Sequence, residues 1–473
     1  MGRVALLLAV ACLGTCSEAP DWLDHVKATG KLVVVTRNSP TTYYLGHDTE
    51  PTGPDYDLVR RFADSLGVTL DIQPRDSLEA LFSAVANGDA HMAAAGLSIT
   101  DRRQSRLTFS EPYQQVRQQL VYKLGTGRPR SVEEIFGRDI VVLRGSSHAE
   151  TLRQIKADHP RLTWREVDRK EVGDLLAEVA AGSIELTVAD SNEFDVHRNF
   201  LPEIRVAFDL GVDDALAFAF AKDHSRNLTT EADRFLARVR RDGRLARIQD
   251  RYYGHTDELD YVGTRSFIRH VDKRLPKYQD WFREAAAQNE LDWRLLAAVG
   301  YQESHWRERA VSPTGVRGIM MLTEATADYL DIADREDPRS SIFGAARFLA
   351  RLKERLPDTI REPDLTWMAL AAYNVGFYHL RDARAIVELG GGNPDVWIEV
   401  REALPLLAQK KWYSRVKYGY ARGWEPVRYV ENIRSYASIL RWLTAERERA
   451  IDPAADDPKL SVPAAAELSD VAP

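Results

Sequence analysis

The segment LAAVGYQESHWRERAVSPTGVRGIMMLT, Leu296 to Thr323, begins as an apolar helix and continues into a glycine-rich loop. Leu295, Val299 and Glu303 follow at intervals of four residues, so a helix would place the Glu303 carboxylate on its apolar stripe. A charged group on a core-facing stripe is costly unless the protein uses it. The same spacing would put Trp306 one turn further, and apolar and aromatic neighbours raise the pKa of a carboxyl group. Glu303 is therefore predicted to be a general acid.

The length and composition of the chain are typical of a globular protein with several lobes. At roughly 150 residues per domain, 473 residues correspond to about three compact units. Hydrophobic residues make up 44% of the chain and charged residues 29%, as in a water-soluble protein. The formal net charge of -7 argues against nucleic acid as the main partner.

Residues 1–16 are predicted to be a signal peptide. The apolar run from Val4 to Leu13 follows a basic residue and is far shorter than the roughly 20 residues that a membrane-spanning helix needs. The run ends in LGTC, which resembles a bacterial lipobox, so that Cys16 would carry lipid. Signal cleavage near Ala19 without lipid is the alternative. Because Ser17 rather than Asp follows the cysteine, the lipobox resemblance favours the periplasmic face of the outer membrane as the location.

Residues 17–266 are expected to form a two-lobed α/β domain. Short apolar strands alternate with amphipathic helices from Lys31 onward, and a second set of this kind begins at Asp139. Such alternation indicates α/β units with mostly parallel sheet, and two sets indicate two lobes.

Residues 267–450 carry helical patterns only and are predicted to form an all-α domain. The final segment, 451–473, is rich in Ala, Pro and Asp and is predicted to be disordered. The chain is thus expected to be multi-domain, with an α/β half followed by a helical half.

The first half contains a candidate site for a small carboxylate. Ser98 lies at the end of a predicted strand and Arg103 follows it, so a hydroxyl donor and a planar guanidinium fork are close in the chain. Ser146 and Ser147 follow another strand and open a predicted helix, where free N–H groups attract anions. Asp190, at the end of a third strand, could bind an ammonium group.

The residues from Lys31 to Tyr253, including the stretch SITDRRQSRLTFSEPY, resemble the extracellular solute-binding proteins of family 3. Proteins of that family bind amino acids between two lobes. The resemblance implies that Arg103 and Ser98 hold the α-carboxylate of an amino-acid or muropeptide ligand, while Asp190 holds its α-amino group. Either of the two adjacent serines would assist. This domain would be regulatory rather than catalytic.

Further motifs follow Glu303 in the helical half. The glycine-rich loop after it contains Ser312, and its glycines permit a tight backbone and close approach by a substrate. AAYNVG then places Tyr373 and Asn374 at the end of an apolar helix. YVENIRSY places Tyr429 at the start of another helix.

In this order, ES, GIMML, AYN and YVENI resemble the goose-type lysozyme-like lytic transglycosylase family. The resemblance implies a lysozyme-like fold and a lyase that cleaves peptidoglycan glycan strands without a cofactor. Glu303 would protonate the glycosidic oxygen between N-acetylmuramic acid and N-acetylglucosamine. It would then take the proton of the muramyl C6 hydroxyl, which closes a 1,6-anhydro ring. Tyr373 and Asn374 would bind the substrate, and Tyr429 would form a hydrogen bond near Glu303.

One departure from the family pattern concerns Met321, which stands where the family usually has Gln. We assign no polar role to that position, and Ser312 becomes the candidate for holding the N-acetyl group. His305 and His379 are not predicted to bind a metal, because no HExxH and no other zinc-type spacing surrounds them.

Two other functions stay open on the sequence. A hydrolytic muramidase would use Glu303 with water instead of the C6 hydroxyl. A non-enzymatic amino-acid or peptide receptor would use the helical half as an anchor to the wall. For the leading interpretation, we expect ligand closure of the two lobes to change access to Glu303, because a hinged clamp is fused to a catalytic domain.

Overall fold

The computed structural model describes residues 21–45, 51–211, 213–254, 261–312 and 315–451. The predicted signal peptide, with Cys16, lies outside these ranges, and so does the predicted disordered tail apart from Ile451. In the described part of the chain, no helix has both the length and the apolar character needed to cross a bilayer.

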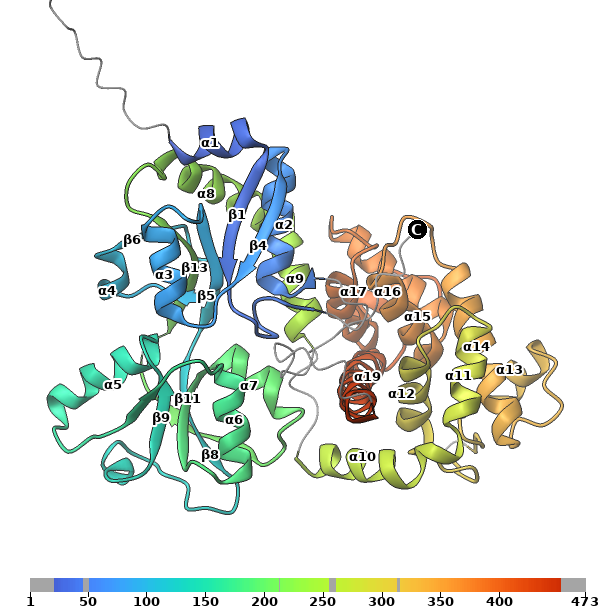
Figure 1. The fold of residues 1–473 in the computed structure, drawn as a ribbon. Helices are drawn as coiled ribbons and strands as arrows, with labels where there is room; N and C mark the ends of the chain where they lie inside the picture. The colour runs from blue at the N-terminus through green and yellow to red at the C-terminus, as the bar shows by residue number, and fades with distance from the viewer. Residues whose placement is uncertain (1–20, 46–50, 212, 255–260, 313–314, 452–473) are drawn as a thin grey trace, which may run out of the picture.

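The first lobe is built on a mixed six-stranded sheet (Figure 1). Its strands run β4-β1-β5-β13-β6, with β7 also paired to β13. They are β1 (Lys31–Thr36), β4 (Thr69–Pro74), β5 (Met92–Ser98), β6 (Leu107–Phe109), β7 (Gln114–Val116) and β13 (Asp214–Ala221). β1 is parallel to β4 and β5, and β13 is antiparallel to β5. A short hairpin joins β2 (Tyr44–Leu45) to β3 (Pro51–Thr52).

Helices cover both faces of this sheet. One face packs against α1 (Trp22–Thr29), α2 (Pro54–Leu66), α8 (Arg226–Arg241) and α9 (Arg244–Tyr253). The other face packs against α3 (Leu78–Ala86), and the short α4 (Asp101–Gln104) follows β5. Burial on both faces explains why a strand such as KLVVVT is a continuous apolar run instead of an alternating one.

The second lobe is inserted between β7 and β13. Its sheet runs β10-β9-β11-β8-β12. The strands are β8 (Gln118–Lys123), β9 (Ile140–Leu143), β10 (Arg165–Val167), β11 (Leu186–Asp190) and β12 (Ile204–Asp209). The helices are α5 (Ser147–Asp158), α6 (Val172–Ala181) and α7 (Ser191–Arg198), with a 3-10 turn at η1 (Glu133–Ile135). The prediction of two α/β lobes is confirmed. The expectation of mostly parallel sheet is wrong, because β13 and β8 each run antiparallel to their neighbours in these sheets.

The rest of the described chain forms helices and no sheet. They are α10 (Tyr261–Lys273), η2 (Leu275–Lys277), α11 (Gln279–Ala287), α12 (Trp293–Ser304), α13 (Glu324–Tyr329), α14 (Pro338–Glu354), α15 (Asp364–Val375), α16 (Phe377–Leu389), α17 (Trp397–Ala403), η3 (Leu404–Ala408), α18 (Lys410–Tyr413) and α19 (Trp424–Ile451). The all-α prediction is confirmed. The predicted domain boundary, between residues 266 and 267, falls inside α10, and it stays a prediction.

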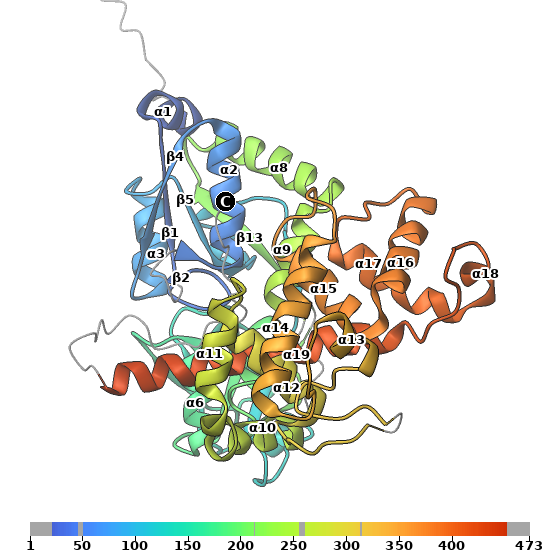
Figure 2. The same ribbon diagram turned by 90° about the vertical axis from the view of Figure 1, so that its right-hand side faces the viewer.

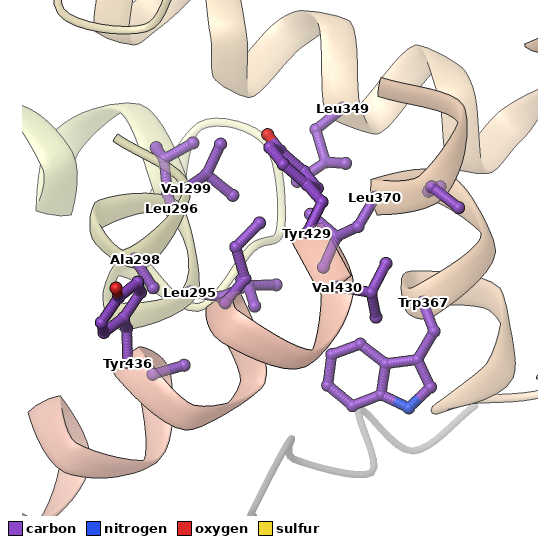
Figure 3. Packing of buried hydrophobic residues seen from close by; sticks show 14 of the residues in the cluster. Leu295, Leu296, Ala298, Val299, Leu349, Trp367, Leu370, Tyr429, Val430 and Tyr436 are labelled. Atoms are coloured by element: carbon purple, nitrogen blue, oxygen red, sulfur yellow. The ribbon is translucent and has the colours of Figure 1, made fainter. Parts of the chain in front are cut away.

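The core of the helical domain lies where α12 packs against α19 and α11, and where α15 packs against α19. Figure 3 shows Leu295 and Val299 of α12 among apolar side chains of α19, α14 and α15. Leu295 is 2% exposed and Val299 1%. Asp292 caps the start of α12: its side chain accepts a hydrogen bond from the backbone N–H of Arg294 at 2.8 Å and also binds Arg441. The predicted apolar stripe that leads to Glu303 is therefore buried.

Helix α19 contacts both lobes of the α/β domain. The guanidinium of Arg434 donates to Asp250 of α9, with Nη1 3.3 Å from Oδ2 and Nη2 2.5 Å from the backbone oxygen. On the second lobe, the ring of Phe200 lies edge-on to Trp442 of α19, with centroids 5.5 Å apart. Arg401 of α17 adds a second ion pair to Asp250 at 2.8 Å. One long helix thus touches the first lobe, the second lobe and the core beneath Glu303.

Candidate active site

Glu303 lies in the last turn of α12, and its side chain is partly buried. The hydroxyl of Tyr429 on α19 donates to Glu303 Oε1 at 2.5 Å. Burial raises the pKa of Glu303 to about 7, although the hydrogen bond from Tyr429 acts in the opposite direction. No second carboxylate among the described residues contributes to this shift. Near neutral pH, Glu303 can therefore both give and accept a proton.

Tyr373 of α15 lies beside Tyr429 and completes this group. The two rings are nearly parallel, at 14°, with centroids 6.4 Å apart. The hydroxyl of Tyr373 donates to the backbone oxygen of Met320 at 2.9 Å. Burial and the neighbouring Glu303 raise the pKa of both tyrosines well above the ordinary value, so both phenols keep their protons as donors. The structure thus brings together three predicted site residues from three helices.

Ser304 holds the glycine-rich segment against the end of α12, a role that was not predicted. Its hydroxyl donates to the backbone oxygen of Ile319 at 2.7 Å and accepts from the N–H of Arg307 at 3.1 Å. Ser304 is 7% exposed. The sequence could have indicated this role, because Ser304 follows Glu303 near the end of the predicted helix and a serine hydroxyl there often binds backbone groups.

The expected position of Trp306 is wrong. Helix α12 ends at Ser304, because His305 and Trp306 both adopt left-handed backbone conformations, with φ of 53° and 54°. Trp306 folds back along the helix, and its indole N–H donates to the backbone oxygen of Ala297 at 2.8 Å. It does not extend the stripe by another turn, and Tyr429 is the aromatic residue bonded to the carboxylate.

The glycine-rich loop needs a glycine at position 318. Gly318 has φ of +96°, and a Cβ there would lie 2.5 Å from the backbone oxygen of Arg335. Ser312, earlier in the loop, accepts a hydrogen bond from the N–H of Val316 at 3.0 Å and helps to close a turn. These contacts tie Ser312 to its own turn, so its role toward the N-acetyl group stays a prediction. Asn374 is exposed at the end of α15, and its role also stays a prediction.

The predicted amino-acid site lies between the two lobes. Arg103 is buried; its guanidinium donates to the backbone oxygen of Ser98 at 2.8 Å and, across the lobes, to that of Gly145 at 3.3 Å. Its face covers the ring of Phe82 at 5.1 Å. Burial lowers the pKa of Arg103 to about 10. The Ser98 hydroxyl and Arg103 Nε are buried without a hydrogen-bond partner, which is uncommon for buried polar groups.

The predicted serine and aspartate residues of the second lobe are also buried. The Ser146 hydroxyl accepts a hydrogen bond from the backbone N–H of Ala149 at 3.1 Å, so it caps α5. It also donates to the backbone oxygen of Leu143 at 2.7 Å. Ser147 is the first residue of that helix. Asp190 lies 3.2 Å from His148 Nε2. The direct ligand contact expected of Ser146 stays a prediction, although its hydroxyl already has two partners.

Arg37 links the two lobes by an ion pair, a role that was not predicted from the sequence. It belongs to the first lobe and pairs with Glu171 of the second, with Nε 2.8 Å from Oε2, and it lies 3.7 Å from Glu193. Burial raises the pKa of Glu193 to about 7. His148, Asp190 and Glu193 present ligand atoms within 4.8 Å of one another and could hold a cation. Arg37 places one positive charge beside both Glu171 and Glu193, at the edge of this group.

Two family models match separate parts of the chain. The bacterial extracellular solute-binding proteins, family 3, match residues 32–255, and the transglycosylase SLT domain matches residues 280–391. Solved structures similar to the first half include the P235GK mutant of ArgBP from T. maritima, at 20% identity and TM-score 0.44, covering 48% of this chain and 97% of that one. An ancestral arginine-binding protein bound to arginine aligns at 22% identity and TM-score 0.43, covering 47% and 97%.

Relatives similar over nearly the whole chain share one name. A membrane-bound lytic murein transglycosylase F of Pseudomonas fluorescens is 49% identical over 433 residues, which cover 91% of this chain and 89% of the relative. The protein of the same name from Ectopseudomonas mendocina is 48% identical over 444 residues, covering 93% and 91%. With such identity across both halves, the chain belongs to the membrane-bound lytic murein transglycosylase F family.

Proposed function

We propose that the chain is a lyase that cleaves the β-1,4 bond between N-acetylmuramic acid and N-acetylglucosamine in murein and leaves a 1,6-anhydromuramyl end. The observation that carries this proposal is a single carboxyl group, Glu303, with a pKa of about 7 and one donor, Tyr429. Family membership supports it, because the relatives are named murein transglycosylases. The hydrolytic muramidase and the non-enzymatic receptor find no such support.

The proposed reaction uses the same carboxyl group twice. Protonated Glu303 gives its proton to the glycosidic oxygen as the C1–O bond breaks. The neighbouring acetamido group shields the oxocarbenium-like C1 centre. Glu303, now a carboxylate, takes the proton of the muramyl C6 hydroxyl while that oxygen forms its bond to C1. The carboxyl group returns to its starting state and no water is consumed, which accounts for one acid where most glycosidases use two.

The two tyrosines support the carboxyl group in both states. Tyr429 stabilises the carboxylate between the two proton transfers by donating a hydrogen bond, and it holds the carboxyl group in place. Tyr373 holds Met320 of the glycine-rich loop beside the site. Ser312 and Asn374 are proposed to contact the sugar, with Ser312 at the N-acetyl group.

The mass of the products tests this function. Purified sacculi digested by the wild-type chain should yield muropeptides one water lighter than the reducing-end products of a muramidase. Glu303→Gln should release neither product while circular dichroism and thermal unfolding show an intact fold. Glu402→Gln, on the exposed surface of α17, is the matched control and should cleave normally. Products with reducing ends would make the chain a hydrolase, and no release by the wild type would contradict the proposed function.

The α/β half is proposed to bind an amino acid or muropeptide between its lobes. Support comes from the unpartnered Ser98 hydroxyl and Arg103 Nε, and from the buried Asp190. In isothermal titration, the wild-type chain should bind amino acids or small wall peptides. The Arg103→Ala variant should not bind them. Arg102→Ala, an exposed neighbour, is the control. Equal affinity for wild type and Arg103→Ala would exclude this site.

Ligand binding is proposed to regulate cleavage through α19. Tyr429 at the active site, Arg434 on the first lobe and Trp442 on the second lobe all lie on this helix. A change in the angle between the lobes would therefore strain or shift the helix that positions Tyr429. The cleavage rate should change when the α/β half is saturated with ligand, and an unchanged rate would show that the sites are independent.

The chain is proposed to act from the periplasmic face of the outer membrane, anchored by lipid on Cys16. Support comes from the sequence of the first 16 residues and from the name of the relatives. Cell fractionation of wild type and Cys16→Ala tests this, since only the wild type should sediment with outer membranes and incorporate labelled fatty acid.

A further inference from the structure

The segment from Gln409 to Trp424, QKKWYSRVKYGYARGW, is rich in both cations and aromatic rings and lacks acidic residues. It includes α18 and joins η3 to α19; we call it the 409–424 loop. Its five cations are Lys410, Lys411, Arg415, Lys417 and Arg422, and its five aromatic residues are Trp412, Tyr413, Tyr418, Tyr420 and Trp424. We propose that this loop is a second binding surface for the murein strand, beyond the cleavage site.

A buried carboxylate keeps the loop in one conformation. Asp382 of α16 is 3% exposed and accepts three backbone N–H groups, from Lys417 at 3.1 Å, Tyr418 at 2.7 Å and Gly419 at 2.9 Å. At the far end, a Cβ on Gly423 would lie 1.7 Å from a backbone oxygen of η3, so the loop is seated directly on that turn. A preformed surface loses little conformational entropy when it binds a partner.

Aromatic rings of this region face solvent. Tyr420 is 59% exposed and Trp424 49% exposed. Tyr378, at the start of α16, is 49% exposed and extends the loop, because its ring lies 4.6 Å from that of Tyr418 at 31°. Exposed rings that contribute nothing to the core provide flat apolar faces on which a sugar ring can stack.

The cations of the loop are available for an anionic partner. In the described part of the chain, Lys410, Lys411, Arg415 and Lys417 are exposed and form no ion pair, whereas Arg422 pairs with Glu425 at 2.9 Å. This positive surface belongs to a chain with a net charge of -7, so it is a local feature. Murein offers the matching chemistry, since its peptide stems carry carboxylates alongside the sugars.

The position of the loop favours murein over another anionic partner. Trp424 is the first residue of α19, and Tyr429 of the active site follows five residues later, about 7.5 Å along the axis. Tyr378 follows Tyr373 of the active site by five residues, across the α15–α16 junction. Figure 2 shows α18 at the edge of the helical domain, away from the α/β lobes. A strand held here would lie next to the residues that cleave it.

Sacculus binding by the catalytically blocked Glu303→Gln chain tests this inference, which rests on the proposed function. Adding Lys410→Gln, Lys411→Gln and Tyr420→Ala should weaken binding about tenfold at low salt, with the unfolding temperature unchanged. The matched control carries Lys27→Gln, Lys273→Gln and Tyr329→Ala, which are exposed residues of other helices, and should bind like the parent.

The outcomes separate the possible partners. Equal binding by the triple variant and the control would overturn the inference while leaving sacculus cleavage by the wild type, and hence the proposed function, untouched. Vesicles containing anionic phospholipid form the second arm. If the triple variant lost vesicle binding but kept sacculus binding, the loop would be a lipid surface and the inference would also be overturned.

Discussion

Replacing Glu303 by Gln should abolish cleavage and also make the protein more stable, by an amount that grows with pH. The carboxyl group has a pKa of about 7 in the folded chain against an ordinary value of 4.5, because burial disfavours its charged form. Between these two values the folded state holds the proton more tightly than the unfolded state. Raising the pH through this window therefore destabilises the wild-type protein. Gln has no proton to lose, and its amide oxygen can still accept the hydrogen bond of Tyr429.

The magnitude follows from the difference between the two pKa values. It corresponds to about 3 kcal/mol once the pH is above 7, and to about 1 kcal/mol at pH 5, where the unfolded chain is already largely ionised. The stability advantage of Glu303→Gln over the wild type should thus increase by about 2 kcal/mol from pH 5 to pH 8. Other titrating groups are common to both proteins and cancel in this comparison.

Urea unfolding at pH 5, 6, 7 and 8, followed by tryptophan fluorescence, measures the difference. Glu402→Gln, the exposed control on α17, should show no such pH-dependent gain. Equal stability of wild type and Glu303→Gln at pH 8, or an advantage that does not change with pH, would show that burial does not hold a proton on Glu303. Glu303 would then lack the proton that a general acid needs near neutral pH.

Three further substitutions test the surroundings of the site. Tyr429→Phe removes the hydrogen bond that lowers the pKa of Glu303. The alkaline limb of the pH–rate profile of muropeptide release should therefore move up by about one pH unit, and the maximal rate should fall. A downward shift of this limb would contradict the role of Tyr429. Gly318→Ala should destabilise the chain by about 2 kcal/mol or more in thermal unfolding, because a Cβ would meet a backbone oxygen at 2.5 Å. Arg434→Met should weaken the contact at Asp250 by about 2 kcal/mol, since Arg401 still pairs with that carboxylate, and should split calorimetric unfolding into two transitions. A single unshifted transition would show that this contact does not hold the domains together.

Local patterns were sufficient to predict the helices and strands and to choose Glu303 as the candidate acid. Leu295, Val299 and Glu303 share a stripe because helix geometry alone places residues four apart on one face. The βα alternation predicted two lobes for a similar reason, since the period of apolar residues reports local backbone structure. The residue at which α12 ends could not be predicted in this way. The left-handed backbone at His305 depends on how Trp306 packs against the helix.

From the sequence alone, Glu303 could be chosen as the candidate acid and placed on an apolar helix. Its surroundings depend on the folded chain, because Tyr429 contacts Glu303 from 126 positions away. Between the lobes, likewise, Arg37 pairs with Glu171 from 134 positions away. Such contacts leave no periodic signal along the chain. The pKa of a carboxyl group depends on every atom packed around it, and that set is assembled only when distant helices meet.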